Sequence, residues 1–402
     1  MNNDYDEKNN RLISDRVKSI APSGIRKFFD LLNSMEGVIS LGIGEPDYTT
    51  PWHIREAAIY SMEKGMTMYT SNSGIPEVRQ ELSRYLKKRF DLEYDWNSEL
   101  LITVGVSEAL DLVMRAILNP GDEVIMPDPS YVSYPACVHL AGGVPVSIPT
   151  YEENDFEISA SDIEARITAK TKAILLGYPA NPTGAVMPHD KLQKIAELAR
   201  KHDILMIVDE IYSQLIYGAE HTCIAALPGM QEHTVLLNGF SKSFAMTGWR
   251  IGYAAAGKPI IAAMTKIHQY TIMCASTMAQ MAALEAMKAG EQDVIDMVED
   301  YNHRRLVTVK GLRDIGLSCF EPKGAFYAFP SIKSTGMSSE EFAEKLLMEE
   351  KVAVVPGTAF GPSGEGYVRC CYATSLKEIE EALVRMKRFL ERHKGVVQLA
   401  HR

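Results

Sequence analysis

Five residues of this sequence have the side-chain types and the order that one kind of covalent chemistry needs. Lys242 lies in the segment GFSKSFAMTGWRIGY, and Arg250 follows it in the same segment. Upstream, YPANPTG contains Asn181, and DEIY contains Asp209 and Tyr212. A lysine amine forms a Schiff base with a carbonyl, a carboxylate pairs with a protonated ring nitrogen, and an arginine holds a phosphate. The Tyr212 hydroxyl and the Asn181 amide can bond to a ring oxygen. Together these groups suit pyridoxal 5'-phosphate (PLP).

The surroundings of Lys242 favour a reactive amine over an ordinary surface lysine. Its neighbours Gly239, Phe240, Phe244 and Ala245 are small or apolar, so we expect the amine to be partly buried. Burial near another cation lowers the pKa of a lysine and frees its nucleophilic form. The sequence therefore predicts that Lys242 is the covalent anchor of the cofactor.

Each of the other residues also has a plain structural interpretation. Asp209 ends an apolar run, where it is either a helix N-cap or a counter-charge for the ring nitrogen. Tyr212 is either a core tyrosine or a donor to the ring oxygen. Asn181 lies in a turn sequence that explains the neighbouring proline and glycine but not the amide. The ordered set, rather than any single residue, supports the PLP hypothesis.

Further residues suit phosphate and substrate anions. Arg250 is a planar bidentate donor, and GVSEA, which begins at Gly105, is a strand end that opens a helix with free N–H groups. Such a glycine turn is weak evidence by itself. Tyr131, in PDPSYVSYP, either stacks on the ring or packs within its loop. Arg369 lies between apolar residues and needs an anionic partner, either a structural carboxylate or a substrate carboxylate.

The middle of the chain predicts a sheet whose strand ends carry these residues. Near-continuous apolar runs, typical of strands covered on both faces, occupy residues 100–105, 123–129, 173–179, 204–210 and 234–240. Helical patterns alternate with these runs, which predicts an α/β fold with a mostly parallel sheet. In such sheets ligands bind beyond the carboxyl ends of the strands, where most of the candidate residues lie.

The composition of the 402 residues indicates an ordinary globular protein. The formal net charge of -10 argues against broad binding to nucleic acid or acidic membranes. The six cysteines have no CxxC spacing, which argues against a disulfide or zinc framework and favours a reducing compartment. The N-terminus has no apolar signal segment, and no apolar run is long enough to span a bilayer. We therefore expect a cytoplasmic protein without a metal site.

The last third of the chain predicts a second, smaller α+β domain. Long helical patterns there precede the strand-like segments KGAFYAFP, VAVVPG and YVRCCYA and a final helix after Ser375. The strand-like segment ISLGIGEPD, near the N-terminus, is expected to pack with this domain. We predict an N-terminal segment at residues 1–48, a large PLP-binding domain at 49–285 and a small domain at 286–402.

Together these segments resemble the class I aminotransferases of PLP fold type I, from about Ser14 to Leu390. The segment from Gly239 to Gly252 fits the lysine-site signature of that family, and further shared segments are SLGIGEPD, GIPEVRQ, ANPTGAV, DEIY, GAFY, VAVVPG and VRCCYATS. The resemblance is close to the aspartate and aromatic aminotransferases of bacteria and archaea. It implies a large domain with a mostly parallel seven-stranded sheet covered by helices, and a smaller α+β domain.

The resemblance also implies the role of each site residue. Lys242 is the Schiff-base lysine and the proton-transfer base, and Asp209 pairs with the ring nitrogen. Tyr212 and Asn181 reach the ring oxygen, while Tyr131 stacks on the ring. The groups that hold the phosphate are those of Gly105, Val106, Ser107, Ser241, Arg250 and, from the neighbouring subunit, Tyr69. The substrate α-carboxylate is bound by Arg369, with Gly44 and Asn181 close to it.

The predicted activity is that of an aminotransferase, a homodimer with shared active sites. By a ping-pong mechanism it moves an amino group between an L-amino acid, aspartate or aromatic, and a 2-oxo acid, with 2-oxoglutarate expected. A PLP-dependent C–S lyase or another α-amino-acid lyase shares the lysine site and is the alternative. A remote alternative is the effector domain of a regulator, which needs a DNA-binding module as well.

Two positions depart from the family pattern. Val106 stands where relatives often have alanine or glycine, which leaves the backbone donor in place. The arginine that classical aspartate aminotransferases use on the distal carboxylate of the substrate has no counterpart that we locate in this sequence.

Overall fold

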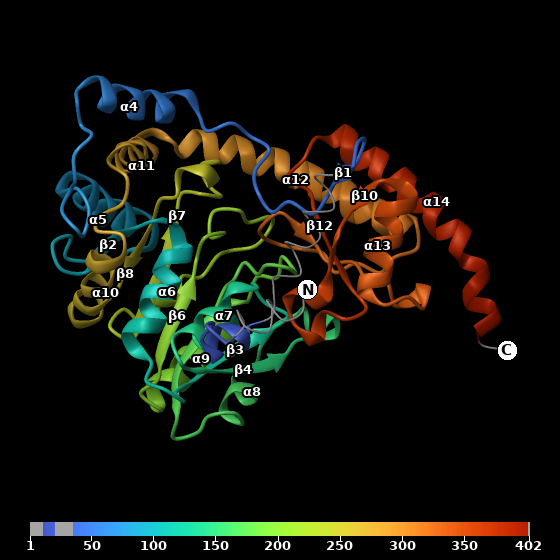
Figure 1. The fold of residues 1–402 in the computed structure, drawn as a ribbon, viewed down its shortest axis with the longest axis horizontal. Helices are drawn as coiled ribbons and strands as arrows, with labels where there is room; N and C mark the ends of the chain where they lie inside the picture. The colour runs from blue at the N-terminus through green and yellow to red at the C-terminus, as the bar shows by residue number, and fades with distance from the viewer. Residues whose placement is uncertain (1–10, 21–34, 401–402) are drawn as a thin grey trace.

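The computed structural model describes residues 11–20 and 35–400, and its elements form two parts (Figure 1). One part is a seven-stranded sheet with helices on its faces. The other part, on the right of the view, gathers α12 (Glu291–Asp314), α13 (Ser339–Glu350) and α14 (Leu376–Ala400) around two short sheets. The chain crosses from the second part to the first between β1 and α4.

The central sheet is mostly parallel, as the sequence predicts. Its strand order is β2-β8-β7-β6-β5-β3-β4, and β8 runs antiparallel to both of its neighbours. The strands are β2 (Leu100–Thr103), β3 (Glu123–Asp128), β4 (Val144–Pro149), β5 (Thr171–Leu176), β6 (Leu205–Asp209), β7 (Thr234–Gly239) and β8 (Gly252–Ala255). This arrangement confirms the predicted α/β fold class.

Two of the seven strands were not among the predicted ones. Strand β4 lies at the edge of the sheet and is largely exposed, so it lacks the continuous apolar run of a central strand. Strand β8 consists of the four residues GYAA, which are too few and too small to form a recognisable apolar run. Its antiparallel direction brings its first residue, Gly252, to the edge where β2 and β7 end.

Successive residues of the central strands point to opposite faces and enter two separate cores. On β5, Ile174 and Leu176 join one core, while Ala173 and Leu175 join the other. The helices of the first core are α4 (Trp52–Glu63), α5 (Pro76–Phe90), α8 (Ala160–Glu164), α9 (His189–Lys201) and α11 (Thr277–Ala289). The helices of the second core are α6 (Gly105–Ile117), α7 (Ser133–Leu140) and α10 (Lys258–Thr271). Among residues 11–20 and 35–400, no helix is long and apolar enough to cross a membrane.

The second part of the molecule contains two small sheets. The first is a parallel pair, and the second is a three-stranded antiparallel sheet of order β11-β12-β9. Their strands are β1 (Ile39–Ser40) with β10 (Val352–Ala353), and β11 (Val355–Pro356), β12 (Val368–Cys371) and β9 (Tyr327–Ala328). The predicted domain limits at residues 48 and 285 stay a prediction, and residue 285 lies within α11.

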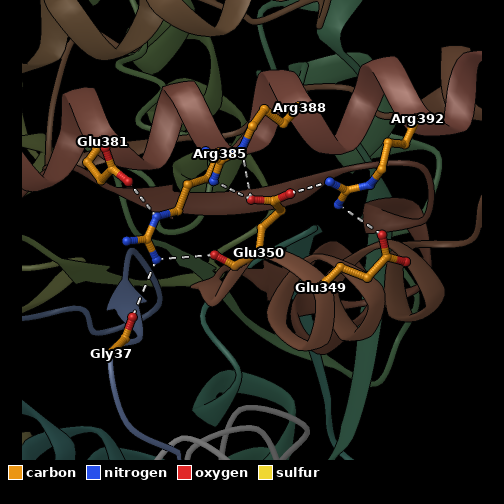
Figure 2. Close-up of polar contacts among 7 residues, drawn as sticks. All are labelled: Gly37, Glu349, Glu350, Glu381, Arg385, Arg388 and Arg392. Carbon is orange, nitrogen blue, oxygen red and sulfur yellow. Dashed lines mark hydrogen bonds and ion pairs between the residues drawn. The ribbon is translucent and has the colours of Figure 1, made fainter.

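An ion-pair cluster joins α13 and α14 to the chain just before β1 (Figure 2). The carboxylate of Glu350, which is 5% exposed, lies 2.8 Å from Arg388 Nη2 and 2.6 Å from Arg392 Nη1. Burial raises the pKa of Glu350, but these two arginines outweigh it and hold the pKa below its usual value. Arg385 donates to the carbonyls of Glu350 (3.2 Å) and Gly37 (3.4 Å). The cluster thus contacts the chain two residues before β1.

Candidate active site

The carboxyl ends of the central strands open into a cavity of about 1240 Å³ between the two parts of the molecule. Nearly all of the predicted site residues line this cavity. They are Gly44, Val106, Ser107, Tyr131, Asn181, Asp209, Tyr212, Ser241, Lys242, Arg250 and Arg369. The structure therefore gathers on one cavity residues that lie as far apart in sequence as Gly44 and Arg369.

Gly252 explains how three of these segments approach one another. It pairs with Thr103 of β2 on one side and with Gly239 of β7 on the other. A Cβ atom at Gly252 would lie 2.9 Å from the backbone of both Gly105 and Val106. The absence of a side chain lets the turn after β2 lie directly against β8, beside the segment that carries Lys242.

Lys242 follows the end of β7 and points its amine into the cavity. Its Nζ donates to the carbonyl oxygen of Gly44 at 2.7 Å. Burial lowers the pKa of the Lys242 amine to about 8, and the charges of Arg369 and Arg250 act in the same direction. An amine with such a pKa is partly neutral at physiological pH, so it is available as a nucleophile and as a base.

Asp209 is the last residue of β6 and is 7% exposed. Burial raises the pKa of its carboxyl to about 6, against the opposing effect of two hydrogen bonds. One comes from the hydroxyl of Tyr134 at 2.9 Å and the other from the Ile211 N–H at 3.2 Å. A buried carboxyl of this kind ionises when a cation comes close, which suits a partner for a protonated ring nitrogen.

The turn after β2 and Arg250 form an anion site at one end of the cavity. Helix α6 begins at Gly105, and no side chain caps the N–H groups of its first turn. A Cβ atom at Gly105 would lie 2.6 Å from Arg250 Nη2, so the guanidinium lies directly against this turn. Helix N–H groups and an arginine fork are the donors that proteins use for phosphate.

Arg369 lies on β12, across the cavity from the sheet, and is 3% exposed. Its Nη1 donates to Asn181 Oδ1 at 2.9 Å and its Nη2 to the Gly42 carbonyl at 2.7 Å. Among the described residues its buried Nε has no hydrogen-bond partner. The rings of Tyr327 and Phe360 lie 4.4 and 4.8 Å from the guanidinium carbon. A buried arginine with an unused donor is suited to an incoming carboxylate.

Two tyrosines of the site were missed by sequence reasoning. Tyr134, on α7, bonds to Asp209 and lies edge to face against Tyr131, with ring centres 5.6 Å apart. Tyr327, on β9, bonds to the hydroxyl of Tyr212 at 2.7 Å. Both belong to segments that were singled out, PDPSYVSYP and GAFY, but a tyrosine in a strand or helix gives no signal of which way its hydroxyl points.

Two predicted residues do not line the cavity of their own chain: Gly105, whose turn lies against Arg250, and Tyr69. Tyr69 is 81% exposed and lies in the loop between α4 and α5. This placement leaves the Tyr69 side chain accessible to a neighbouring subunit.

Comparison with known proteins identifies the family. The model of the aminotransferase class I and II family matches residues 36–386. The chain belongs to this family. It is 47% identical to the aspartate aminotransferase of Pyrococcus abyssi, over 95% of this chain and 99% of that protein. It is 45% identical to aromatic-amino-acid aminotransferase 2 of Thermococcus litoralis, over 96% of this chain and 100% of that protein.

A solved structure agrees with this assignment. The aspartate aminotransferase of Thermus thermophilus with maleate has a TM-score of 0.89 and 39% identity, and the match covers 94% of this chain and 99% of that one. The chain is therefore an aminotransferase that moves an amino group between amino acids and 2-oxo acids, and its cofactor is PLP. The relatives favour amino transfer over the lyase and regulator alternatives.

The low pKa of Lys242 in this aminotransferase predicts unusual reactivity of its amine. In the apo-protein, acylation of Lys242 by acetic anhydride should rise with pH between about 7 and 9 and then level off, because the neutral amine is half populated at a pH of about 8. Mass spectrometry of the Lys242 peptide measures the extent of reaction at each pH. A short lysine peptide in the same reaction mixtures is the control, and its acylation should reach its midpoint at a pH of about 10.4. A Lys242 midpoint equal to that of the peptide would contradict this prediction.

Arg369→Lys should raise KM for every amino donor and acceptor alike, by roughly 10- to 100-fold, because lysine cannot replace the bidentate fork on an α-carboxylate. Steady-state kinetics with several amino acids would measure it. Arg388→Lys, in the ion-pair cluster of Figure 2, makes the same chemical change outside the cavity and should leave KM unchanged. An increase in KM for one donor alone would mean that Arg369 binds the substrate side chain instead of the α-carboxylate.

Proposed function

We propose that the cavity binds PLP with Lys242 as its covalent anchor and Asp209 beside the ring nitrogen. In this proposal Asn181 and Tyr212 bond to the ring oxygen and Tyr131 stacks on the ring, and all three residues line the cavity. The phosphate is held by Gly105, Val106, Ser107, Ser241 and Arg250. The fit rests on the chemistry of the donors: an amine with a lowered pKa, a buried carboxyl, and an anion site face one cavity.

The residues around the cofactor have separate tasks in this proposal. PLP, when bound, acts as an electron sink that makes the α-proton of an amino acid removable. The Lys242 amine then takes and returns that proton, for which a pKa near neutrality is well suited. Asp209 keeps the ring nitrogen protonated, because an ionised carboxylate stabilises the adjacent positive charge.

The proposed amino donor is aspartate or an aromatic amino acid, and the proposed acceptor is 2-oxoglutarate. The observation that supports a carboxylate substrate is the buried Nε of Arg369, a cavity-lining residue, which has no hydrogen-bond partner among the described residues. The α-carboxylate is common to all of these substrates, so Arg369 serves each of them. The relatives named above act on aspartate or on aromatic amino acids, and one of them binds maleate, a dicarboxylate.

We further propose a homodimer in which Tyr69 reaches the phosphate site of the partner subunit. Large apolar side chains are exposed together on α4, on the loop after it and at the end of α10. They include Trp52 (57%), Tyr60 (58%), Met68 (79%), Tyr69 (81%) and Tyr270 (84%). Hydrogen bonds from Asn72 to the Met273 carbonyl and from Thr277 to the Met68 carbonyl join these segments. An exposed patch of this kind marks an interface.

The cytoplasm is the proposed compartment. All six cysteines are free thiols, and four of them are buried: Cys223, Cys319, Cys370 and Cys371. Free buried thiols in place of disulfides are typical of proteins that work under reducing conditions.

The PLP assignment is tested by two substitutions. Lys242→Ala should lose the visible absorbance band of the bound cofactor and lower kcat by about 10²–10⁴-fold or more, because anchor and base are removed together. Asp209→Asn keeps the shape and should still bind PLP, but kcat should fall roughly 100-fold. In the parent, aspartate or an aromatic amino acid added alone should bleach the band. Full turnover in Lys242→Ala would exclude the proposed anchor.

The shared site is tested by complementation between subunits. Tyr69→Ala and Arg369→Ala chains, carrying different affinity tags, would be co-expressed and the heterodimer isolated. One of its sites should then be intact and the other doubly damaged, so the heterodimer should recover about half of the parent activity. Each homodimeric variant is the control. A heterodimer no more active than the controls, or a monomeric mass in solution, would refute the shared site.

A further inference from the structure

Tyr327 contacts both the carboxylate-binding arginine and the ring-oxygen tyrosine. Its hydroxyl lies 2.7 Å from that of Tyr212, and its ring centre lies 4.4 Å from the guanidinium carbon of Arg369. It is 1% exposed. A Cβ atom at Gly44 would lie 2.5 Å from the Tyr327 hydroxyl, so Gly44 leaves the space that this hydroxyl occupies. Three predicted site residues, Tyr212, Arg369 and Gly44, thus surround the Tyr327 side chain, for which the sequence predicts no role.

The hydrogen bond between the two hydroxyls uses the proton of only one of them, and which hydroxyl donates decides what Tyr212 can do. Each hydroxyl has one proton to donate and can accept further hydrogen bonds. If Tyr212 donated to Tyr327, it would have no proton left for a ring oxygen in the cavity. If Tyr327 donates to Tyr212, the Tyr212 proton remains for the cavity. The contact between the two hydroxyls allows either direction, and only the second leaves Tyr212 able to donate to the ring oxygen, as the proposed function requires.

Burial keeps both protons in place. It raises the pKa of Tyr212 and of Tyr327 above the ordinary value, and the nearby charge of Arg369 offsets only part of this effect. Both hydroxyls therefore stay neutral donors at physiological pH. Accepting a hydrogen bond also makes a hydroxyl a stronger donor, because hydrogen bonds in a chain polarise one another.

We propose that Tyr327 is a positioning residue for the cofactor ring: its hydroxyl donates to Tyr212, which turns the Tyr212 proton toward the ring oxygen. Both groups that serve the ring oxygen then connect to Arg369. Asn181 accepts from the guanidinium directly at 2.9 Å, and Tyr212 is linked to it through Tyr327. This inference rests on the proposed function, because it assumes that PLP occupies the cavity.

The test is a pH titration of the visible band of the PLP-loaded enzyme. The bound cofactor shares one proton between its imine nitrogen and its ring oxygen, and a donor to that oxygen lowers the pKa of this proton by stabilising the anionic oxygen. Tyr327→Phe should weaken the Tyr212 donor and raise this pKa by roughly 0.2–0.6 unit. Tyr212→Phe should raise it by roughly 1–2 units. Adding Tyr327→Phe to Tyr212→Phe should cause no further rise, because Tyr327 acts through Tyr212.

Two controls separate this role from a structural one. Tyr372→Phe also removes a fully buried hydroxyl, which bonds to the Ala325 carbonyl outside the cavity, and should leave the titration unchanged. Incorporation of 3-fluorotyrosine at position 327 keeps the hydroxyl but makes it a stronger donor, so it should lower the pKa.

Each of three results would overturn the inference. The first is an unchanged or lowered pKa of the visible band in Tyr327→Phe. The second is a raised pKa with 3-fluorotyrosine at position 327. The third is a rise from Tyr327→Phe that is equally large in the parent and in the Tyr212→Phe variant. A parent protein that forms no visible band with PLP would overturn the proposed function as well, whereas a normal band with an unmoved titration would overturn this inference alone.

Discussion

The site depends on holding three cationic side chains around one cavity without a carboxylate partner for any of them. Within residues 11–20 and 35–400, the ion pairs of the structure include none formed by Lys242, Arg250 or Arg369. Their acceptors are uncharged oxygens, which belong to Gly44, Thr247, Gly42 and Asn181. Arg369 is buried and Lys242 is partly buried, whereas Arg250 is exposed. Burial of unpaired charge is unfavourable, so Arg369 and Lys242 keep these positions only because the fold enforces them. Bound molecules can supply the missing anions, and in the proposed function a phosphate and an α-carboxylate would do so.

Asp209, a buried carboxyl of the cavity, likewise forms no ion pair with these cations in the described part of the chain. Asp209 ends β6 and receives neutral donors, Tyr134 and the Ile211 N–H. Burial raises its pKa to about 6 even though the Lys242 charge acts in the opposite direction. An ion pair between Asp209 and Lys242 would neutralise both residues and leave neither for a ligand. Their separation leaves each able to bind its own part of one cofactor.

Sequence reasoning found the charged groups of this site because charge type and strand ends are visible in the chain. Apolar runs predicted β2, β3, β5, β6 and β7, and the polar residues after them met in space as expected. It could not find groups whose role depends on orientation. The hydroxyls of Tyr134 and Tyr327 act through side-chain directions set by packing. The resemblance pointed to Gly44, but the Gly42 carbonyl is a backbone group that every residue has, so no residue type indicates it.

The N-terminal segment connects the ion-pair cluster of Figure 2 to the cavity. Strand β1 is only two residues long, and the carbonyls that follow it, at Gly42 and Gly44, accept hydrogen bonds from Arg369 and Lys242. In the proposed function the Lys242 amine is joined to a cofactor, and its bond to the Gly44 carbonyl would then be lost. The segment would keep other attachments, which include the pairing of β1 with β10, the Leu41 carbonyl on the Cys371 N–H, the Gly42 carbonyl on Arg369, and the Gly37 carbonyl on Arg385. Because Arg385 belongs to a cluster outside the cavity, that last attachment is independent of what the site binds.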